Sequence, residues 1–198
     1  MAFIVASVIM LYVAGINKKY IIVSFLLVII AIPLLYFFVL PEHAKLRIDV
    51  YLNPYLDPRG AGYNIIQSKL AIGAGRLIGQ GWMNGTQTHL GFLYPKTTDF
   101  IFSVIGEELG FVGATGILLL FCALIWRGVI IGMRARDRFG ALIAFGMVLH
   151  LALQVALNVA VVTDTLPNTG IGLPFFSYGG SSMIICLVER GVVLSVSN

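Results

Sequence analysis

Three acidic side chains lie within a strongly apolar stretch of the chain, GFLYPKTTDFIFSVIGEELGFVGA at residues 91–114. An ionised carboxylate near the bilayer centre costs about 2.5 to 3.5 kcal/mol, so acids in apolar segments usually face a water-filled cavity or a cation. Asp99 opens the stretch, where unpaired backbone N–H groups and the helix dipole favour a carboxylate as an N-cap. Glu107 and Glu108 follow about two turns later. Capping no longer helps there, and an Arg or a bound cation would serve as their partner.

A polar stripe is predicted within GALIAFGMVLHLALQVALNVAVV at residues 140–162. His150, Gln154 and Asn158 recur every four residues, so they share one face of a helix and would avoid lipid. Two roles stay open for this stripe. It can form interhelical hydrogen bonds, each worth about 0.6 kcal/mol, or it can line a substrate cavity.

A segment rich in glycine and proline, TLPNTGIGLPFFSYGGSSM at residues 165–183, precedes the last apolar run. Its prolines and glycines suit a helix start that packs closely against neighbouring helices. Ser177 and Ser181, with Tyr178 and Ser182, add hydroxyls around the same glycines. The segment therefore suits the wall of a polar cavity equally well.

The segment AIGAGRLIGQG at residues 71–81 has the glycine content of a phosphate-binding loop. It lacks the preceding strand and the Lys-Ser or Lys-Thr ending of such a loop, so a nucleotide site is not expected. We expect its glycines to thin and bend a helix for packing. Arg76 among them is suited to meet an anionic headgroup.

The composition requires a bilayer around these segments. The chain has 198 residues, of which 59% are hydrophobic and 11% charged, and its mean hydropathy is +0.95. Its apolar runs have the length needed to cross about 30 Å of hydrocarbon, without the alternation of a β-barrel. The sequence therefore predicts an all-α polytopic transmembrane helical bundle, a single membrane domain over residues 1–198. Cys122 and Cys186 lie inside apolar runs, so no disulfide is expected.

Five to six membrane spans are predicted from the apolar runs. The runs cover residues 1–15, 20–40, 62–79, 100–126, 140–163 and 173–196. The weakest is 62–79, because it carries Gln67, Ser68, Lys69 and Arg76, and hydropathy alone would leave it lying in the interface.

Basic residues predict the orientation of these spans. The connection that carries Arg127, Arg134, Arg136 and Arg138 is the strongest cytoplasmic signal, which places Asp99 outside, in a loop at about 80–99. The connection 41–61 has three basic residues and also prefers the cytoplasm, which requires 62–79 to cross. Six crossings with both ends cytoplasmic follow, although Lys18 and Lys19 then lie outside. The formal charge of +4 is explained by this topology without a nucleic-acid partner.

Five stretches of the chain resemble the SEDS family, the shape, elongation, division and sporulation proteins typified by RodA and FtsW. They run in the family's order from about residue 45 to the end, and the GTQTHLGFL part is more like RodA. The stretches are NPYLDPRGAGYNIIQSKLAIGAGRLIGQGWMNGTQTHLGFL, TTDFIFSVIGEELGFVG, RARDRFG, QVALNVAVVTDTLP and TGIGLPFFSYGGSS.

The resemblance implies a ten-span bundle in the bacterial cytoplasmic membrane, of which this chain is about the C-terminal half. Such a bundle polymerises lipid II into glycan strands on the external face during cell elongation and shape maintenance. It works with a class B penicillin-binding protein and membrane lipids. Whether this half folds or acts alone stays open. Two rival functions also stay open, a lipid II flippase and an FtsW-like division polymerase or scaffold.

Asp99 matches the family's essential acidic residue, which implies the role of general base. A glycan is extended when a sugar hydroxyl loses its proton and attacks the anomeric carbon of a lipid-linked diphosphate. One carboxylate suffices, because a diphosphate leaves unprotonated once cations stabilise its charge, unlike the leaving group of two-carboxylate glycosidases. Candidate cations are Lys96, Lys69 and Arg76, and a divalent ion, Mg²⁺ or Mn²⁺, is a further candidate.

The remaining candidates are assigned to substrate binding in the cavity. They share a polar side chain in a stretch that matches the family: Glu107, Glu108, Gln154, Asn158, Ser177 and Ser181. The chain departs from the family at Thr97, where members often have a His before the Thr-Asp pair, and at Tyr94, where a Pro is usual. The resemblance therefore implies no role for a His at position 97 of this chain.

Overall fold

The computed structural model describes residues 9–10, 15, 19–20, 23, 26–27, 49–51, 53–58, 60, 62–89, 98–167 and 170–196. The predicted spans at 1–15 and 20–40 therefore lie almost entirely outside the described residues, as do Tyr94, Lys96 and Thr97. The described part of the chain contains helices and no strand, which confirms the all-α prediction.

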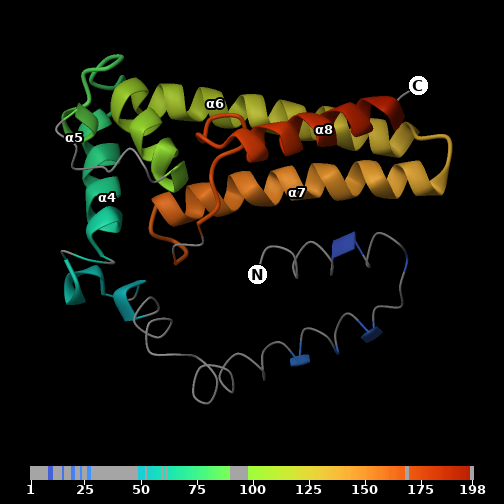
Figure 1. The fold of residues 1–198 in the computed structure, drawn as a ribbon, viewed down its shortest axis with the longest axis horizontal. Coiled ribbons are helices and arrows are strands. Elements are labelled where there is room, and N and C mark those ends of the chain that lie inside the picture. The colour runs from blue at the N-terminus through green and yellow to red at the C-terminus, as the bar shows by residue number, and fades with distance from the viewer. Residues whose placement is uncertain are drawn as a thin grey trace.

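Three long helices lie side by side, and a shorter helix runs across one end of them (Figure 1). The long helices are α6 (Ile101–Arg134), α7 (Arg138–Val162) and α8 (Gly180–Val196), and the crossing helix is α4 (Tyr63–Gly75). The short elements are η1 (Pro54–Leu56), α5 (Thr86–His89) and η2 (Thr98–Phe100).

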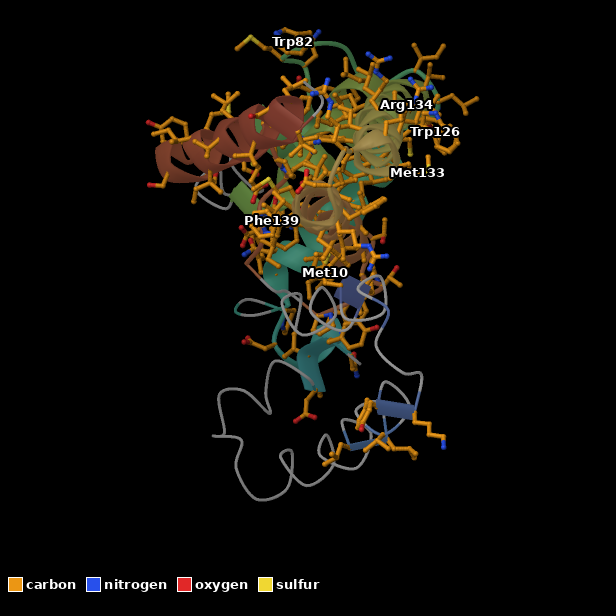
Figure 2. The ribbon with its side chains drawn as sticks, turned by 90° about the vertical axis from the view of Figure 1, so that its right-hand side faces the viewer. Met10, Trp82, Trp126, Met133, Arg134 and Phe139 are labelled. Atoms are coloured by element: carbon orange, nitrogen blue, oxygen red, sulfur yellow. The ribbon has the colours of Figure 1, made fainter. Side chains whose placement is uncertain are left out.

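Two of these helices, α6 and α7, are long and apolar enough to cross a membrane. Their most apolar 18-residue windows have mean hydropathies of 2.3 and 2.0, but only 17% and 28% of those windows are buried. The described part of the chain leaves most of these apolar surfaces uncovered, as expected for helices of a membrane bundle. Figure 2 shows Trp126 and Met133 on α6 directed away from the bundle, and each is 66% exposed.

The predicted boundaries of the last three spans differ by a few residues from the observed helices. The 140–163 span is α7, which begins where the Asp137 carboxylate accepts a hydrogen bond from the Gly140 N–H at 2.9 Å. The 100–126 span continues as α6 to Arg134, and the 173–196 span becomes helical only at Gly180. Pro174 and the turn after it delay that start.

Helix α6 is sharply bent at Gly110, whose φ of 67° and ψ of −167° are not helical. The bend frees backbone groups on both sides, and the glycine-rich segment 76–81 binds them. Gln80 N and Gly81 N donate to the carbonyls of Glu107 and Glu108 at 2.9 and 3.0 Å. In return, Phe111 N and Val112 N donate to the carbonyls of residues 76 and 77 at 2.9 and 3.0 Å. These four bonds replace helical hydrogen bonds that the bend removes, which is why the break is tolerated.

Helix α4 is too short to cross a bilayer by itself. Its 13 residues span about 20 Å at 1.5 Å per residue, against about 30 Å of hydrocarbon. A buried hydrogen-bonded group holds α4 to the other helices, because Ser68 Oγ lies 2.7 Å from Ser103 Oγ and donates to Val162 O at 2.9 Å. At Gly75 a Cβ would overlap the carbonyl oxygen of Gly106, so glycine is required for this close approach.

The predicted crossing of segment 62–79 is wrong. Tyr51 Oη donates to the Thr165 carbonyl at 2.6 Å, and Lys69 forms an ion pair with Asp164. Both partners lie in the loop after α7, at the end opposite the Arg134 to Arg138 turn. The described part of connection 41–61 and α4 therefore share the Asp99 end, which leaves five predicted crossings. The prediction of six crossings gave too much weight to the basic residues of this long connection. Basic residues indicate the cytoplasmic side most reliably in short turns.

Candidate active site

Asp99 lies in η2, the turn immediately before α6, and its side chain is half-buried. The N-cap of α6 is Phe100, without a side-chain cap, so the predicted capping role of Asp99 is wrong. Phe100 is 1% exposed and packs in the core beside Leu151, Val162 and Leu173, each at most 1% exposed. The turn that carries the acid is thus anchored in the buried core of the described helices.

Asn158 joins this turn to the segment after α7. Its amide nitrogen donates to the backbone carbonyl of Asp99 at 2.8 Å and to that of Ile171 at 2.9 Å. A Cβ built on Gly170 would lie 3.8 Å from Asp99 Oδ2, so the backbone of the GIGL sequence forms a wall beside the carboxylate. Gly170 has a φ of +70°, which glycine adopts without strain.

Of the three predicted cations, only Lys69 and Arg76 lie among the described residues. The Lys69 side chain is 52% exposed and pairs with Asp164, whose side chain is 9% exposed. Arg76 is exposed at the end of α4, with a φ of 47°. It borders an open hollow of about 740 Å³ lined by residues 73–80, so it is accessible to an anion from outside the protein.

Glu107 has neutral hydrogen-bond donors where a cation was expected. Its carboxylate is fully buried and accepts from Gln87 N at 2.7 Å, Thr88 N at 3.2 Å, Thr88 Oγ1 at 2.7 Å and Thr86 Oγ1 at 3.3 Å. It therefore binds the N-terminal end of α5 and fixes the loop between α4 and Asp99. Glu108 is half-buried, and its backbone carbonyl takes part in the bend described above.

The polar stripe of α7 is used for bonds between helices and loops. His150 Nδ1 lies 2.7 Å from Glu189 Oε1 on α8, and Asn158 binds the Asp99 turn. Gln154 is half-buried, and its Oε1 has no hydrogen-bond partner among the described residues. The interhelical role left open for the stripe is thus observed at His150, while substrate binding by Gln154 stays a prediction.

The predicted hydroxyl ligands lie farther along the same segment. Ser177 is half-buried in the turn before α8, where its backbone N–H donates to Leu173 O at 2.9 Å, and Ser181 is exposed in the first turn of α8. Sequence reasoning missed Asp164 and Glu189. Each is a lone acid next to or within an apolar run, and this is the signal that could have identified them.

Within the described ranges, no three His, Cys, Asp or Glu side chains gather around a common point that could hold a metal. The Glu107 oxygens already accept four hydrogen bonds, and Asp164 is paired with Lys69. These residues do not fit a protein-held Mg²⁺ or Mn²⁺, and a divalent ion that arrives with a diphosphate stays a prediction.

Comparison with known proteins relates this arrangement to the wall-synthesis machinery of bacteria. The profile of the family FTSW_RODA_SPOVE, described as cell cycle protein, matches residues 1–198. The chain is 45% identical to peptidoglycan glycosyltransferase MrdB of Escherichia coli K12 over 186 residues, which cover 94% of this chain and 50% of that protein. It is also 45% identical to the probable peptidoglycan glycosyltransferase FtsW of Geobacter metallireducens over 192 residues, 96% of this chain and 50% of that protein.

A solved structure has the same fold. It is described as "Structural coordination of polymerization and crosslinking by a peptidoglycan synthase complex", and one of its chains matches with a TM-score of 0.76 and 30% identity. The match covers 95% of this chain and 51% of that chain. The chain spans about half the length of the curated relatives that it matches.

Proposed function

Because this chain belongs to the FtsW, RodA and SpoVE family of cell cycle proteins, we propose that it forms part of a peptidoglycan glycosyltransferase with Asp99 as its base. The single observation that carries the proposal is the placement of Asp99. It is a half-buried acid on a turn at the end of the membrane-length helices. Asn158 joins the backbone of this turn to the backbone of Ile171, next to Gly170. The two relatives named as peptidoglycan glycosyltransferases support the reaction.

The substrate proposed for this site is lipid II, a disaccharide peptide carried on a polyprenyl diphosphate. The Asp99 carboxylate accepts the proton of a sugar hydroxyl as the hydroxyl oxygen bonds to the anomeric carbon of the lipid-linked sugar. The bond from that carbon to the diphosphate oxygen breaks, and the diphosphate leaves with the electron pair. Developing negative charge on the leaving group needs nearby cations.

Lys69 and Arg76 are suited to hold that diphosphate, and Lys96 precedes the base by three residues. An ammonium group has three donors, so Lys69 can bind an anion while it remains paired with Asp164. Arg76 presents a planar guanidinium at an accessible position next to the hollow. Both lie on α4 or at its end, close to the loop after α7.

We place this site on the external face of the bacterial cytoplasmic membrane. The short turn from Arg134 to Arg138 carries three arginines, and short basic turns favour the cytoplasm. Asp99 lies at the other end of α6, one crossing away. A class B penicillin-binding protein is the proposed partner, since the structural neighbour is a complex that coordinates polymerization with crosslinking.

Polymer formation from lipid II by the purified full-length protein and its partner tests the proposal. We expect Asp99→Ala and Asp99→Asn to lower the polymerisation rate at least about 100-fold, the usual size of a general-base effect. Gly116→Ala is the matched control, because its site on the lipid-exposed part of α6 has open space for a methyl group. Asp99→Ala polymerising at the wild-type rate would overturn the assignment.

The rival functions predict other outcomes in the same system. A flippase would move labelled lipid II between leaflets without making polymer, and a scaffold would recruit its partner without either reaction. The proposed role in elongation is supported by the similarity to MrdB, and the division role by equal similarity to FtsW. Depletion in cells separates them, since rounded cells indicate elongation and filaments indicate division.

A further inference from the structure

Asn158 uses both of its donor hydrogens on backbone carbonyls at the Asp99 end of α7. The side chain is completely buried, and one amide nitrogen donates to both Asp99 O and Ile171 O. These two acceptors come from segments that are 72 residues apart in sequence, 171 minus 99. Through these two bonds the Asn158 side chain joins both segments directly.

The orientation of this amide is set by its surroundings. Two carbonyl oxygens face the nitrogen, and an oxygen in its place would repel both. Asn158 Oδ1 is buried and has no hydrogen-bond partner within the described ranges. The hydrogen bonds observed for the side chain are therefore both made by its amide nitrogen, and together they bind the two segments.

We propose that Asn158 is a positioning residue for the base, a role that rests on the proposed function. By holding the Asp99 carbonyl against Ile171, it fixes the carboxylate relative to the Gly170 wall. A catalytic group displaced by about 1 Å can lose on the order of 100-fold in rate. Asn158 does not reach substrate itself, since none of its surface is exposed.

The alternative is that Asn158 contributes only to stability, because it is completely buried and lies on the same face of α7 as the core residues Val155 and Val162. Kinetics separate the two roles. Asn158→Leu keeps the branched shape and the number of side-chain heavy atoms and removes both hydrogen bonds. Asn158→Asp keeps the shape but places an oxygen against the carbonyls. For full-length protein acting on lipid II, we expect kcat to fall at least tenfold for both variants, with KM changed less than threefold.

The matched control is Ser68→Ala. Ser68 is equally buried and also donates to a backbone carbonyl at the same end of α7, but its hydrogen bonds go to Ser103 and Val162 and not to Asp99 or Ile171. We expect it to lower the melting temperature without changing kcat of the folded protein. If Asn158→Leu does not accumulate in membranes, Asn158→Ser replaces it as the variant without both bonds.

Combination with Asp99→Glu tests whether Asn158 acts through the base. That variant keeps the carboxylate but moves it by the length of one methylene group, so the carboxylate is already out of the position that Asn158 would maintain. Adding Asn158→Leu should then cost less than threefold more in kcat, since effects on one catalytic unit are not additive. The proposal would be overturned if the losses in kcat of Asn158→Leu and Asp99→Glu multiply in the double variant. It would also be overturned if Asn158→Leu alone leaves kcat unchanged.

Backbone hydrogen exchange gives a readout that does not depend on activity. In Asn158→Leu, amides of η2 and of residues 170–173 should exchange at least tenfold faster, whereas Ser68→Ala should leave both segments unchanged. If these amides exchange at the wild-type rate in Asn158→Leu, Asn158 does not hold the two segments together, and the proposal is overturned even if the protein polymerises lipid II. A wild-type protein that makes no polymer would instead refute the proposed function, and the exchange data would still decide whether Asn158 joins the segments.

Discussion

Glu107 is a buried acid whose observed hydrogen-bond partners, among the described residues, are all neutral donors. Two backbone N–H groups and two threonine hydroxyls surround it, and all of them belong to α5. Hydrogen bonds to a carboxylate are stronger than those between neutral groups. The residue therefore couples the bent part of α6 to the loop that leads toward Asp99, and its main task is to hold that loop in place.

Glu107→Gln should destabilise the protein by about 2 to 3 kcal/mol, because its NH₂ group would face N–H and O–H donors. Thermal unfolding in detergent measures the effect. Glu108→Gln is the matched control, since Glu108 is half-buried and only its backbone takes part in the bend, and we expect a change below about 0.5 kcal/mol. Equal melting temperatures for the two variants would contradict the anchoring role.

The ion pair between Lys69 and Asp164 predicts that a second substitution restores stability lost by the first. Lys69 is half-exposed, so the pair itself contributes about 0 to 1 kcal/mol. Asp164 is nearly buried, and removal of its cation leaves an uncompensated carboxylate. We expect Lys69→Met to lower the melting temperature and Asp164→Asn to restore most of the loss in the double variant. A double variant less stable than Lys69→Met would contradict this coupling.

Sequence reasoning at the residue scale selected Asp99 as the candidate base, which stays a prediction, and it did not identify partners distant in sequence. It correctly required that Glu107 be compensated inside the protein and then chose a cation, since a carboxylate pattern does not distinguish a cation from a helix N-terminus. It predicted from their spacing that His150 and Asn158 lie on the same face of one helix. It could not supply Glu189 or the Asp99 carbonyl as acceptors, because those contacts arise only when separate segments pack together.

At the scale of elements, the bend in α6 and the segment 76–81 form one unit. The sequence analysis expected the glycines of AIGAGRLIGQG to bend and thin their own helix, and they also accommodate a bend in another helix. Gly79 and Gly110 approach so closely that a Cβ on Gly110 would overlap the backbone of residue 79. Each half of the unit satisfies the backbone groups that the other leaves open.

Gly110→Ala should therefore lower stability by more than 2 kcal/mol, because a positive φ strains alanine and its methyl group would meet the Leu77 carbonyl oxygen at 2.7 Å. Gly116→Ala in the same helix has open space and a helical backbone, so it should be neutral or slightly stabilising. Thermal unfolding of both variants tests this. Equal behaviour would show that α6 does not need its bend.

Hydropathy predicted the elements with unequal success for a physical reason. The 140–163 span agrees with α7 because its apolar run is long and its ends are set locally, by the Asp137 cap and by Thr163. Segment 62–79 was misplaced because its polar residues bind protein at the Asp99 end, and hydropathy does not record such partners. Lys69 and Ser68 have those roles in the structure.

For the whole molecule, the position of α4 changes the predicted topology. With connection 41–61 at the Asp99 end, the 20–40 span would start on the side of the Arg134 to Arg138 turn. Lys18 and Lys19 then precede that span on the cytoplasmic side. The two basic residues that opposed the six-crossing arrangement support the five-crossing one, because they lie in a short turn where the charge rule applies.

Thiol labelling in intact cells tests this topology. After replacement of Cys122 and Cys186, Tyr55→Cys and Arg136→Cys give one reporter at each end of the bundle, and both positions are exposed. Five crossings predict that a membrane-impermeant maleimide added to cells with a permeabilised outer membrane labels position 55 and not position 136. Cell lysis should then allow position 136 to react. If position 55 also requires lysis, segment 62–79 crosses the bilayer. Asp99 would then no longer share a side with α4, and the two cations proposed to hold the diphosphate would be separated from the base.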